Sequence, residues 1–387
     1  MAGPWHILTG EYPPQSGGVS DYTAMVARAL ASAGDDVHVW APAFEGAAMR
    51  TTDRGVTVHR LPRGFDERGL GVLEQEIDEH AGPRTLLVQY VPHAFGARGM
   101  NLRFCRWVQH RARGGHDDVR VMFHEPYYPF AVWPFHRNLL ALANRVMAVL
   151  LLSDLRTAYV STTAWERRLS KYAPRARRFV WLPIPSSIPV ADGEAIEVWR
   201  DRLRGSATQL VGHFGTYGRL VVRHLGPALV QLLSEHAEVG VALIGPGGGA
   251  FAEQVCAGHP DWATRVTATE RLEAKDVAAC VAACDVMLQP YADGASGRRT
   301  TLMASLINGA AVVTNRGAAT EPVWDTSAAV ALVGSSRSGA LAGALAALLA
   351  DPAVRERLGD AGRALYADRF ALEHTVEALR AGGRGSA

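Results

Sequence analysis

The most informative segment of this chain reads Pro290-Tyr-Ala-Asp-Gly-Ala-Ser-Gly-Arg-Arg-Thr-Thr-Leu-Met-Ala-Ser-Leu-Ile-Asn-Gly-Ala-Ala-Val-Val-Thr-Asn315. It continues an apolar run at Asp285–Tyr291, typical of a buried strand, through a glycine-rich loop into a helix that opens near Arg298. A helix starting in such a loop offers backbone N–H groups and the positive end of its dipole to an anion. Arg298 and Arg299 add forked donors that suit phosphate oxygens. We therefore expect a diphosphate to bind here, although an ordinary strand-to-helix connection with two solvated arginines has the same local pattern.

Length and charge narrow the classes of function. The chain has 387 residues, enough for two domains that each bury a core. Its net charge of +2 gives no reason to expect nucleic acid as a partner. The lysines are Lys171 and Lys275, so a phosphate site has to rely on arginine.

The cysteines indicate neither disulfides nor a metal. Four of them are too few and too scattered for a disulfide framework. Cys280 and Cys284 are expected on the core-facing side of a helix, and no histidine stands near them at ligand spacing. We expect no metal and no cofactor. The N-terminus runs directly into a strand without a secretion leader, which predicts a cytoplasmic protein.

Short apolar runs alternate with helical stretches along the chain, which predicts an α/β fold with parallel sheets. In the first half we expect strands at Trp5–Thr9, Asp36–Trp40, Val56–Leu61, Thr85–Val91, Val119–His124, Thr157–Ser161 and Phe179–Pro183. In the second half we expect them at Gln209–Gly215, Val239–Gly245, Arg265–Thr269, Asp285–Tyr291, Ala311–Thr314 and Ala328–Val333.

A Pro- and Ser-containing segment, Pro183–Pro189, interrupts this alternation and is interpreted as a linker. It predicts an N-terminal Rossmann-like domain at 1–189 and a C-terminal Rossmann-like domain at 190–365. Residues 366–387 are expected to form a C-terminal helix that packs back on the N-terminal domain, followed by a frayed tail. Ligands of such sheets bind at the carboxyl ends of the strands, so we expect a cleft between the two domains.

The first strand is followed by a polar glycine loop, Gly10–Asp21. Gly17 and Gly18 leave room for a ligand to approach the backbone, and Ser20 or Asp21 is expected to cap the next helix. The loop lacks the GxGxxG pattern of dinucleotide binding. A plain capped turn is the alternative interpretation.

A second polar loop, Phe123-His-Glu-Pro-Tyr-Tyr-Pro-Phe130, follows a later strand. His124 and Glu125 are expected to project beyond the sheet, and Tyr127 could stack on a sugar. We assign His93, Glu125 and Tyr127 to the acceptor side. The alternative is a histidine whose hydrogen bonds are satisfied inside the domain.

The second domain opens with a strand, a glycine loop and a basic helix start, within Val211–His224. Gly215 lies in the loop, and Arg219 and Arg223 are within reach of the same anion. Two basic glycine loops in one domain favour a diphosphate site more than either does by itself.

The order of these segments resembles the GT-B glycosyltransferases, specifically the retaining family 4 that includes glycogen and sucrose synthases. The resemblance covers most of the chain and is carried by Glu11–Val19, Phe123–Pro126, Val241–Gly247, Asp276–Pro290 and Gly309–Val313. It implies two Rossmann-like domains and transfer of a hexose, with retention, from a nucleoside diphosphate sugar to a hydroxyl of a glycan, a lipid-linked sugar or a small metabolite.

Two departures from the family pattern affect the expected site. Alignment on Gly309–Val313 places the family's two glutamates at Ser296 and Ala304, which leaves Asp293 as the nearest carboxylate. Arginines also replace the family's arginine–lysine pair. The residues expected at the donor and its diphosphate are therefore Gly17, Gly18, Gly215, Arg219, Arg223, Gly294, Ser296, Gly297, Arg298, Arg299 and Thr300.

The chemistry implied by the resemblance needs no carboxylate nucleophile, because the leaving phosphate can accept the proton of the acceptor on the same face. His124 would hydrogen-bond the sugar or support its developing charge, and Asp293 would serve the sugar. No metal is expected, since the chain has no Asp-x-Asp sequence.

Other interpretations stay open at this point. The missing glutamates are also compatible with a non-catalytic scaffold that binds a nucleotide sugar or a partner, and the same scaffold occurs in UDP-sugar epimerases. The basic segment Gly99–Arg113 carries Leu102, Phe104, Trp107 and Val108, a pattern compatible with weak peripheral contact with the inner membrane face or with a surface helix packed on the sheet. The oligomeric state is left open.

Overall fold

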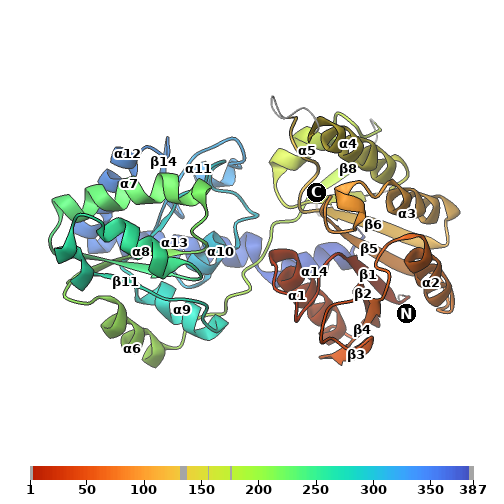
Figure 1. Ribbon diagram of the computed structural model, residues 1–387, viewed down its shortest axis with the longest axis horizontal. Helices are drawn as coiled ribbons and strands as arrows, with labels where there is room; N and C mark the ends of the chain where they lie inside the picture. The colour runs from red at the N-terminus through yellow and green to blue at the C-terminus, as the bar shows by residue number, and fades with distance from the viewer. Residues whose placement is uncertain (1–2, 131–136, 156, 175–176, 383–387) are drawn as a thin grey trace. The chain divides into compact units, whose positions relative to one another are not determined.

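The computed structural model describes residues 3–130, 137–155, 157–174 and 177–382. The chain divides into unit 1, formed by Met1–Pro183 and Leu372–Ala387, and unit 2, formed by Ile184–Ala371 (Figure 1). The boundaries lie at Pro183/Ile184 and Ala371/Leu372, whereas the sequence analysis placed them at 189/190 and 365/366. Each unit is described by itself below.

Unit 1 is built on an eight-stranded sheet with the order β3-β4-β2-β1-β5-β6-β7-β8. Its strands are β1 (Trp5–Thr9), β2 (Val37–Pro42), β3 (Arg50–Asp53), β4 (Val56–Leu61), β5 (Arg84–Tyr90), β6 (Asp117–Phe123), β7 (Thr157–Val160) and β8 (Arg178–Trp181). All neighbouring pairs are parallel except β3 with β4, so the expected parallel sheet carries one antiparallel edge strand. The central strands are buried along most of their length, except at Thr85 and Asp118 near the starts of β5 and β6, as parallel strands covered on both faces are.

The helices of unit 1 are α1 (Gly18–Ser32), α2 (Glu67–Asp78), α3 (Leu102–Gly114), α4 (Arg137–Ser153), α5 (Thr163–Leu169) and α14 (Leu372–Arg380), with the short η1 (Ala97–Gly99). The last of these, α14, contacts α1, and Arg380 forms an ion pair of 3.3 Å with Asp35. Tyr159 in β7 donates a hydrogen bond to the backbone oxygen of Ala378. The end of the chain therefore belongs to the unit in which the chain begins.

Unit 2 is built on a parallel six-stranded sheet with the order β11-β10-β9-β12-β13-β14. Its strands are β9 (Gln209–Phe214), β10 (Val239–Ile244), β11 (Val266–Ala268), β12 (Val286–Gln289), β13 (Val312–Asn315) and β14 (Ala331–Val333). Its helical elements are α6 (Gly193–Leu203), α7 (Arg219–Glu235), α8 (Gly248–Cys256), η2 (Pro260–Thr264), α9 (Ala274–Ala283), α10 (Thr300–Ile307), α11 (Val323–Thr326), α12 (Ser338–Ala350), α13 (Pro352–Leu365) and η3 (Tyr366–Phe370).

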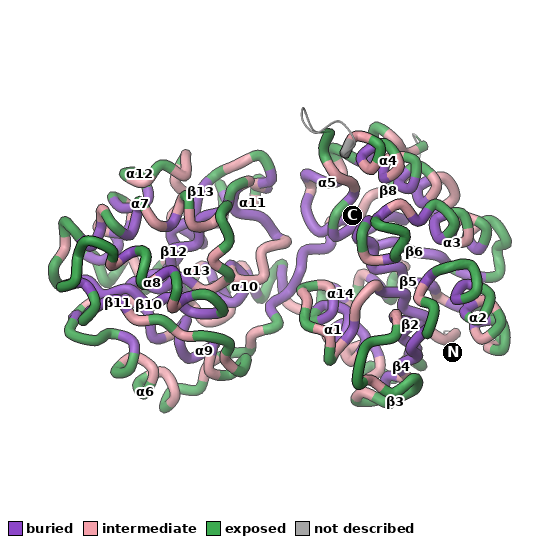
Figure 2. The backbone as a smooth tube through the Cα atoms, viewed as in Figure 1, coloured by how far each residue is buried: buried purple, intermediate pink, exposed green. Residues whose placement is uncertain are grey.

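Each sheet forms the buried layer of its unit, as the purple strands in Figure 2 show. In unit 2 the core lies where leucines of α7 and α12 pack on valines of β9, β10 and β13. This packing fixes the ends of the strands, and the loops that leave those ends carry the polar residues considered next.

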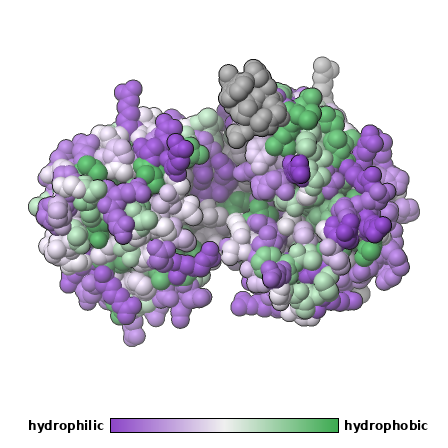
Figure 3. Space-filling view, viewed as in Figure 1, coloured by the Kyte–Doolittle hydropathy of each residue, from purple (hydrophilic) through white to green (hydrophobic). Residues whose placement is uncertain are grey.

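The apolar side chains of α3 divide between the core and the surface. Phe104 and Val108 are buried, Trp107 is half-buried and Leu102 is exposed, so part of the apolar stripe packs on the core. The exposed apolar stripe lies on α4, at Leu139, Leu142, Val146 and Val149, where Figure 3 shows hydrophobic surface. Within the described residues, no helix is both long and apolar enough to cross a bilayer.

Candidate functional site

The glycine-rich loop between β12 and α10 is clamped to the neighbouring strand β13. The amide of Asn315 accepts from the backbone N–H of Tyr291 at 2.8 Å and donates to its carbonyl at 2.9 Å. The backbone N–H of Ala295 donates to the carbonyl of Asn315. These bonds hold the loop at the carboxyl end of the sheet, the end at which ligands of parallel sheets bind.

Gly294 meets a steric requirement of this loop. Its φ is +91°, and a Cβ at this position would lie 2.2 Å from the backbone nitrogen of Gly317. Any side chain would therefore clash and be strained. The structure therefore requires glycine at position 294 for the backbone of the loop. The N–H of Gly294 donates to the carbonyl of Tyr291.

Asp293 holds the two adjacent arginines. One carboxylate oxygen accepts from Nη2 of Arg298 at 2.6 Å, and the other accepts from Nη2 of Arg299. The Arg299 guanidinium lies 4.6 Å from the centre of the Tyr291 ring, and burial lowers its pKa while leaving it positively charged. Each guanidinium has five N–H donors, so binding to Asp293 leaves donors for a second anion, and Nε of Arg299 has no partner among the described residues.

Glu321 is a buried carboxylate beside this loop that the sequence interpretation missed. It accepts from the backbone N–H of Gly297 at 3.1–3.2 Å and from Nε1 of Trp324 at 2.8 Å. Burial lowers the pKa of Arg299, and the negative charge of Glu321 opposes this effect in part. Glu321 follows β13, so a search of every strand's carboxyl end would have included it.

Two residues predicted at the donor, Gly297 and Ser296, are buried. Gly297 is buried, and its N–H is bound to Glu321 while its carbonyl accepts from Ile184. Ser296 is fully buried, and its Oγ has no hydrogen-bond partner among the described residues. Ala304, the second position aligned with a glutamate in the sequence analysis, lies in the core. Gly297 therefore anchors the loop and does not offer its amide to a phosphate.

The loop after β9 lies against the start of α10. A Cβ on Gly215 would lie 3.7 Å from Cγ2 of Thr301, so the two predicted glycine loops are brought together. Arg219 and Arg223 are exposed on the first turns of α7. The N-caps of α7 and α10 make no side-chain hydrogen bond, which leaves Thr300 and its neighbours at an uncapped helix start.

In unit 1, the carboxylate of Glu11 caps α1. It accepts from the backbone N–H groups of Val19 at 3.1 Å and Ser20 at 3.0 Å. The helix begins at Gly18, so Ser20 and Asp21 lie in its first turn, and the expectation that one of them provides the cap is wrong. A Cβ on Gly17 would lie 2.2 Å from the Glu11 carboxylate, whereas Gly18 faces open space. Gly17 thus makes room for Glu11.

His124 is buried at the carboxyl end of β6 and is neutral. Its Nε2 donates to the side-chain oxygen of Gln89 at 2.8 Å, and its ring meets the edge of Tyr22 on α1. Burial lowers its pKa to about 3. Nε2 is satisfied inside the domain, and the neutral ring keeps Nδ1 as an acceptor. It can therefore accept a hydroxyl hydrogen bond but does not supply a positive charge.

The three residues assigned to the acceptor side do not form one cluster. His93 is bound to the hydroxyl of Tyr128 at 3.1 Å and lines a cavity of about 910 Å³ within unit 1. Tyr127 instead donates to the carbonyl of Arg168 and stacks under Arg145. Glu125 is exposed. The cavity is otherwise lined mainly by Arg63–Arg68 and Ala94–Arg103.

A family model matches part of the chain. Residues 223–381, less than half of the chain, match a family described as glycosyl transferase-like. No curated protein sequence is significantly similar to the chain.

Solved structures resemble the chain over nearly its whole length. Sucrose-phosphate synthase from Thermosynechococcus elongatus is 16% identical with a TM-score of 0.75, covering 99% of this chain and 98% of that one. HepE of Anabaena, in complex with UDP and glucose, is 13% identical with a TM-score of 0.69 and 98% coverage of both chains. WaaG, a glycosyltransferase involved in lipopolysaccharide biosynthesis, is 17% identical with a TM-score of 0.68, covering 99% of this chain and 100% of that one.

These neighbours are GT-B glycosyltransferases, and at these identities the likeness establishes the fold. The fold class predicted from the sequence, an α/β protein with two parallel-sheet domains of the GT-B type, is confirmed.

Proposed function

We propose that this chain is a retaining hexosyltransferase that moves a hexose from a nucleoside diphosphate sugar to a hydroxyl acceptor. The observation that carries the proposal is the arrangement of Arg298 and Arg299 around Asp293 at the uncapped start of α10. Two guanidinium groups and a helix N-terminus at one strand end suit the two charges of a diphosphate. The glycosyl transferase-like family match, which includes this loop, supports the same interpretation.

The central step is departure of the diphosphate as positive charge develops on the sugar. Cations already positioned at the leaving oxygens stabilise that charge without reorganising. Before the sugar nucleotide binds, Asp293 balances the positive charges of Arg298 and Arg299. After it binds, phosphate oxygens accept from the remaining N–H groups of the two arginines. Asp293 is then the carboxylate nearest to the sugar, as the loop sequence implies.

Unit 1 supplies the neutral His124 and the open backbone at Gly18. We assign Nδ1 of His124 to a hydrogen bond from a hexose hydroxyl, since its low pKa excludes a cationic role at neutral pH. The acceptor hydroxyl gives its proton to the leaving phosphate on the same face of the sugar, so no carboxylate base is required.

A solved neighbour and a cavity of unit 1 indicate which substrates to test first. HepE was solved with UDP and glucose, which supports a UDP-sugar as the first donor to test. The cavity beside His93 is lined by charged side chains, including Arg63 and Arg103, together with apolar ones such as Phe65 and Met100, so it can take an acceptor that has both polar groups and an apolar part. We propose a cytoplasmic enzyme whose transfer reaction uses no metal or other cofactor. Weak peripheral membrane contact stays part of the proposal, supported by the apolar stripe of α4.

One observation favours a second candidate. Neither Ser296 nor Ala304 is acidic, and both are buried, so the two glutamates of the family have no replacement at their own positions. A scaffold that binds a nucleotide sugar without transferring it, or a UDP-sugar epimerase, would share this geometry.

Incubation of the purified chain with UDP-, GDP- and dTDP-hexoses, with and without hydroxyl acceptors, separates these functions. The proposal predicts release of the nucleoside diphosphate and a glycoside of unchanged anomeric configuration. Binding of a sugar nucleotide without product would establish the scaffold, and acceptor-independent interconversion of UDP-sugars would establish the epimerase.

A further inference from the structure

Four histidines gather at the amino-terminal end of the sheet in unit 1, the end opposite to the candidate site. His6 and His38 are the second residues of β1 and β2 and are register partners, His59 lies in β4, and His80 follows α2. The centre of the His80 ring lies 4.4 Å from that of His38 and 5.0 Å from that of His6. The proposed transfer reaction uses none of these residues.

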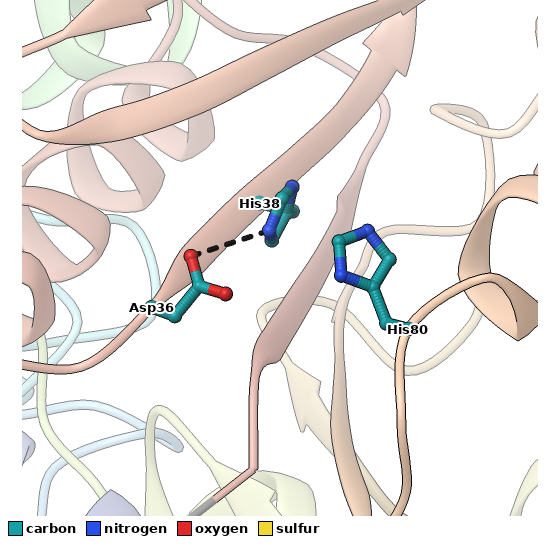
Figure 4. Close-up of side chains that lie close together, drawn as sticks. All are labelled: Asp36, His38 and His80. Atoms are coloured by element: carbon teal, nitrogen blue, oxygen red, sulfur yellow. Dashed lines mark ion pairs between the residues drawn. The ribbon is translucent and has the colours of Figure 1, made fainter.

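Three side chains of this region point toward one another, as Figure 4 shows for Asp36, His38 and His80. One ligand atom of each lies within 4.8 Å of those of the other two. Asp36 Oδ1 is 3.3 Å from Nε2 of His38. Asp36 is exposed and His80 is half-buried, so a solvated ion can reach the group and keep water as a further ligand.

Two histidines and two carboxylates of this region make three polar contacts but have only two N–H groups between them. A row of side chains runs from Asp36 through His38 and His59 to Glu76, with contacts of 3.3, 3.0 and 3.5 Å. Two neutral imidazoles have two N–H groups for three contacts. One of the three contacts therefore has no proton, and two lone pairs face each other there. If this contact is the one between Asp36 and His38, a cation between the two atoms removes the repulsion.

Nε2 of His38 is buried and has no hydrogen-bond partner among the described residues. A nitrogen of this kind binds a metal ion when the imidazole is neutral.

His6 is not available as a ligand. Nε1 of Trp40 donates to its Nδ1 at 3.2 Å, so the proton of the neutral ring is on Nε2. Arg84, a cation near the His6 ring, forms ion pairs with Asp78 and Asp117. The remaining candidate ligand set is one carboxylate and two imidazoles.

We propose that Asp36, His38 and His80 bind a divalent transition-metal ion of the zinc type, with water as the fourth ligand. Zinc prefers imidazole nitrogen and carboxylate oxygen at about 2.0–2.2 Å. The ligand atoms need to close by roughly 1 Å from their widest separation, which side-chain rotation of the exposed Asp36 and the half-buried His80 allows. The bond from Nδ1 of His38 to His59 orients the liganding nitrogen, a common arrangement around zinc.

The position of this site indicates a structural role. An ion here joins the start of β2 to the segment after α2, far along the sheet from the strand ends that carry the candidate site. Binding to the folded chain alone raises its stability by mass action.

The test is titration of untagged, chelator-treated full-length chain with Co²⁺, followed by absorbance, and with Zn²⁺, followed by calorimetry and thermal unfolding. We expect one equivalent to bind, a higher unfolding temperature, and a Co²⁺ spectrum without thiolate charge transfer. Asp36→Asn and His80→Gln change side chains that are not fully buried, and each should weaken binding at least tenfold. His110→Gln, an exposed histidine on α3, is the matched control and should bind like the wild type.

Failure of the wild type to bind one equivalent saturably would overturn the proposal. Equal affinity in Asp36→Asn, His80→Gln and His110→Gln would also overturn it and would place any bound ion elsewhere. Neither outcome bears on sugar transfer, because these residues take no part in it.

Discussion

At the scale of the residue, one carboxylate allows two arginines to lie side by side. Asp293 binds both Arg298 and Arg299, and this arrangement keeps two cations in a partly buried loop before a substrate arrives. All three residues lie within seven positions of one loop, so their proximity follows from the sequence, but the sequence analysis assigned Asp293 to the sugar and missed its ion pairs with the arginines.

Contacts between distant positions could not be predicted in the same way. Glu11 caps a helix from eight residues upstream, and Glu321 reaches an amide 24 positions away. These contacts depend on how distant segments of the backbone come together in the fold, which local sequence patterns do not show. The partner of His124, Gln89, lies 35 residues away on the neighbouring strand β5.

His124→Ala tests the role of the neutral histidine. We expect kcat to fall by about tenfold or more, as for loss of one hydrogen bond made in the transition state, while donor Kd changes little. Because the pKa of His124 is about 3, its protonation adds no inflection to the wild-type rate profile between pH 5 and 8. Steady-state kinetics with donor titrations measure both quantities.

An unchanged kcat in His124→Ala would remove this residue from the mechanism. A loss confined to donor Kd would instead assign it to ground-state binding.

At the scale of the element, the candidate donor loop depends on the end of β13 and on the segment that leads from it into α11. Asn315 clamps Tyr291, and Glu321 binds the amide of Gly297 and the indole of Trp324. The loop is therefore held from the side of its neighbouring strand.

Glu321→Ala tests this dependence. It leaves two donors, the Gly297 N–H and Trp324 Nε1, without their acceptor, which costs about 1–3 kcal/mol for each buried group. We expect Glu321→Ala to lower the unfolding temperature clearly and to weaken binding of the sugar nucleotide. Glu321→Gln retains an acceptor oxygen, so its effects should be smaller. Thermal unfolding with and without nucleoside diphosphate provides the measurement.

Asp325→Ala is the matched control, because Asp325 is an exposed carboxylate on α11 whose ion pair with Arg316 is screened by solvent. If Glu321→Ala unfolded at the same temperature as Asp325→Ala, the buried carboxylate would not support the loop.

Most strands could be predicted, and the missed elements have physical explanations. The expected runs at Trp5–Thr9 and Val56–Leu61 match β1 and β4 at both ends. The edge strand β3 was missed because its sequence, Arg-Thr-Thr-Asp, is polar and largely exposed. In α2 the apolar spacing is helical, but Gly69 and Gly71 weaken the signal. In α6 only Leu203 is buried, so little apolar period exists to be recognised.

At the scale of the whole molecule, each of the two sheets carries part of the candidate site residues. Unit 2 carries the paired arginines and glycine loops at the ends of β9 and β12, while unit 1 carries His124 and the cavity beside His93 at the ends of its own strands. The rule that ligands bind at carboxyl strand ends could locate these loops from sequence alone. It could not find the histidine group at the opposite end, which depends on strand register and on the segment after α2.

The central claim is that the loop at the start of α10 binds a diphosphate. Calorimetric titration of the full chain with UDP, and with GDP and dTDP if UDP does not bind, tests it in Arg298→Ala and Arg299→Ala. Arg357→Ala, an exposed arginine on α13, is the control. Loss of a charge-assisted hydrogen bond is worth about 1.5–3 kcal/mol, so each loop variant should bind roughly 10- to 150-fold more weakly than the control. Wild-type affinity in both loop variants would contradict the account.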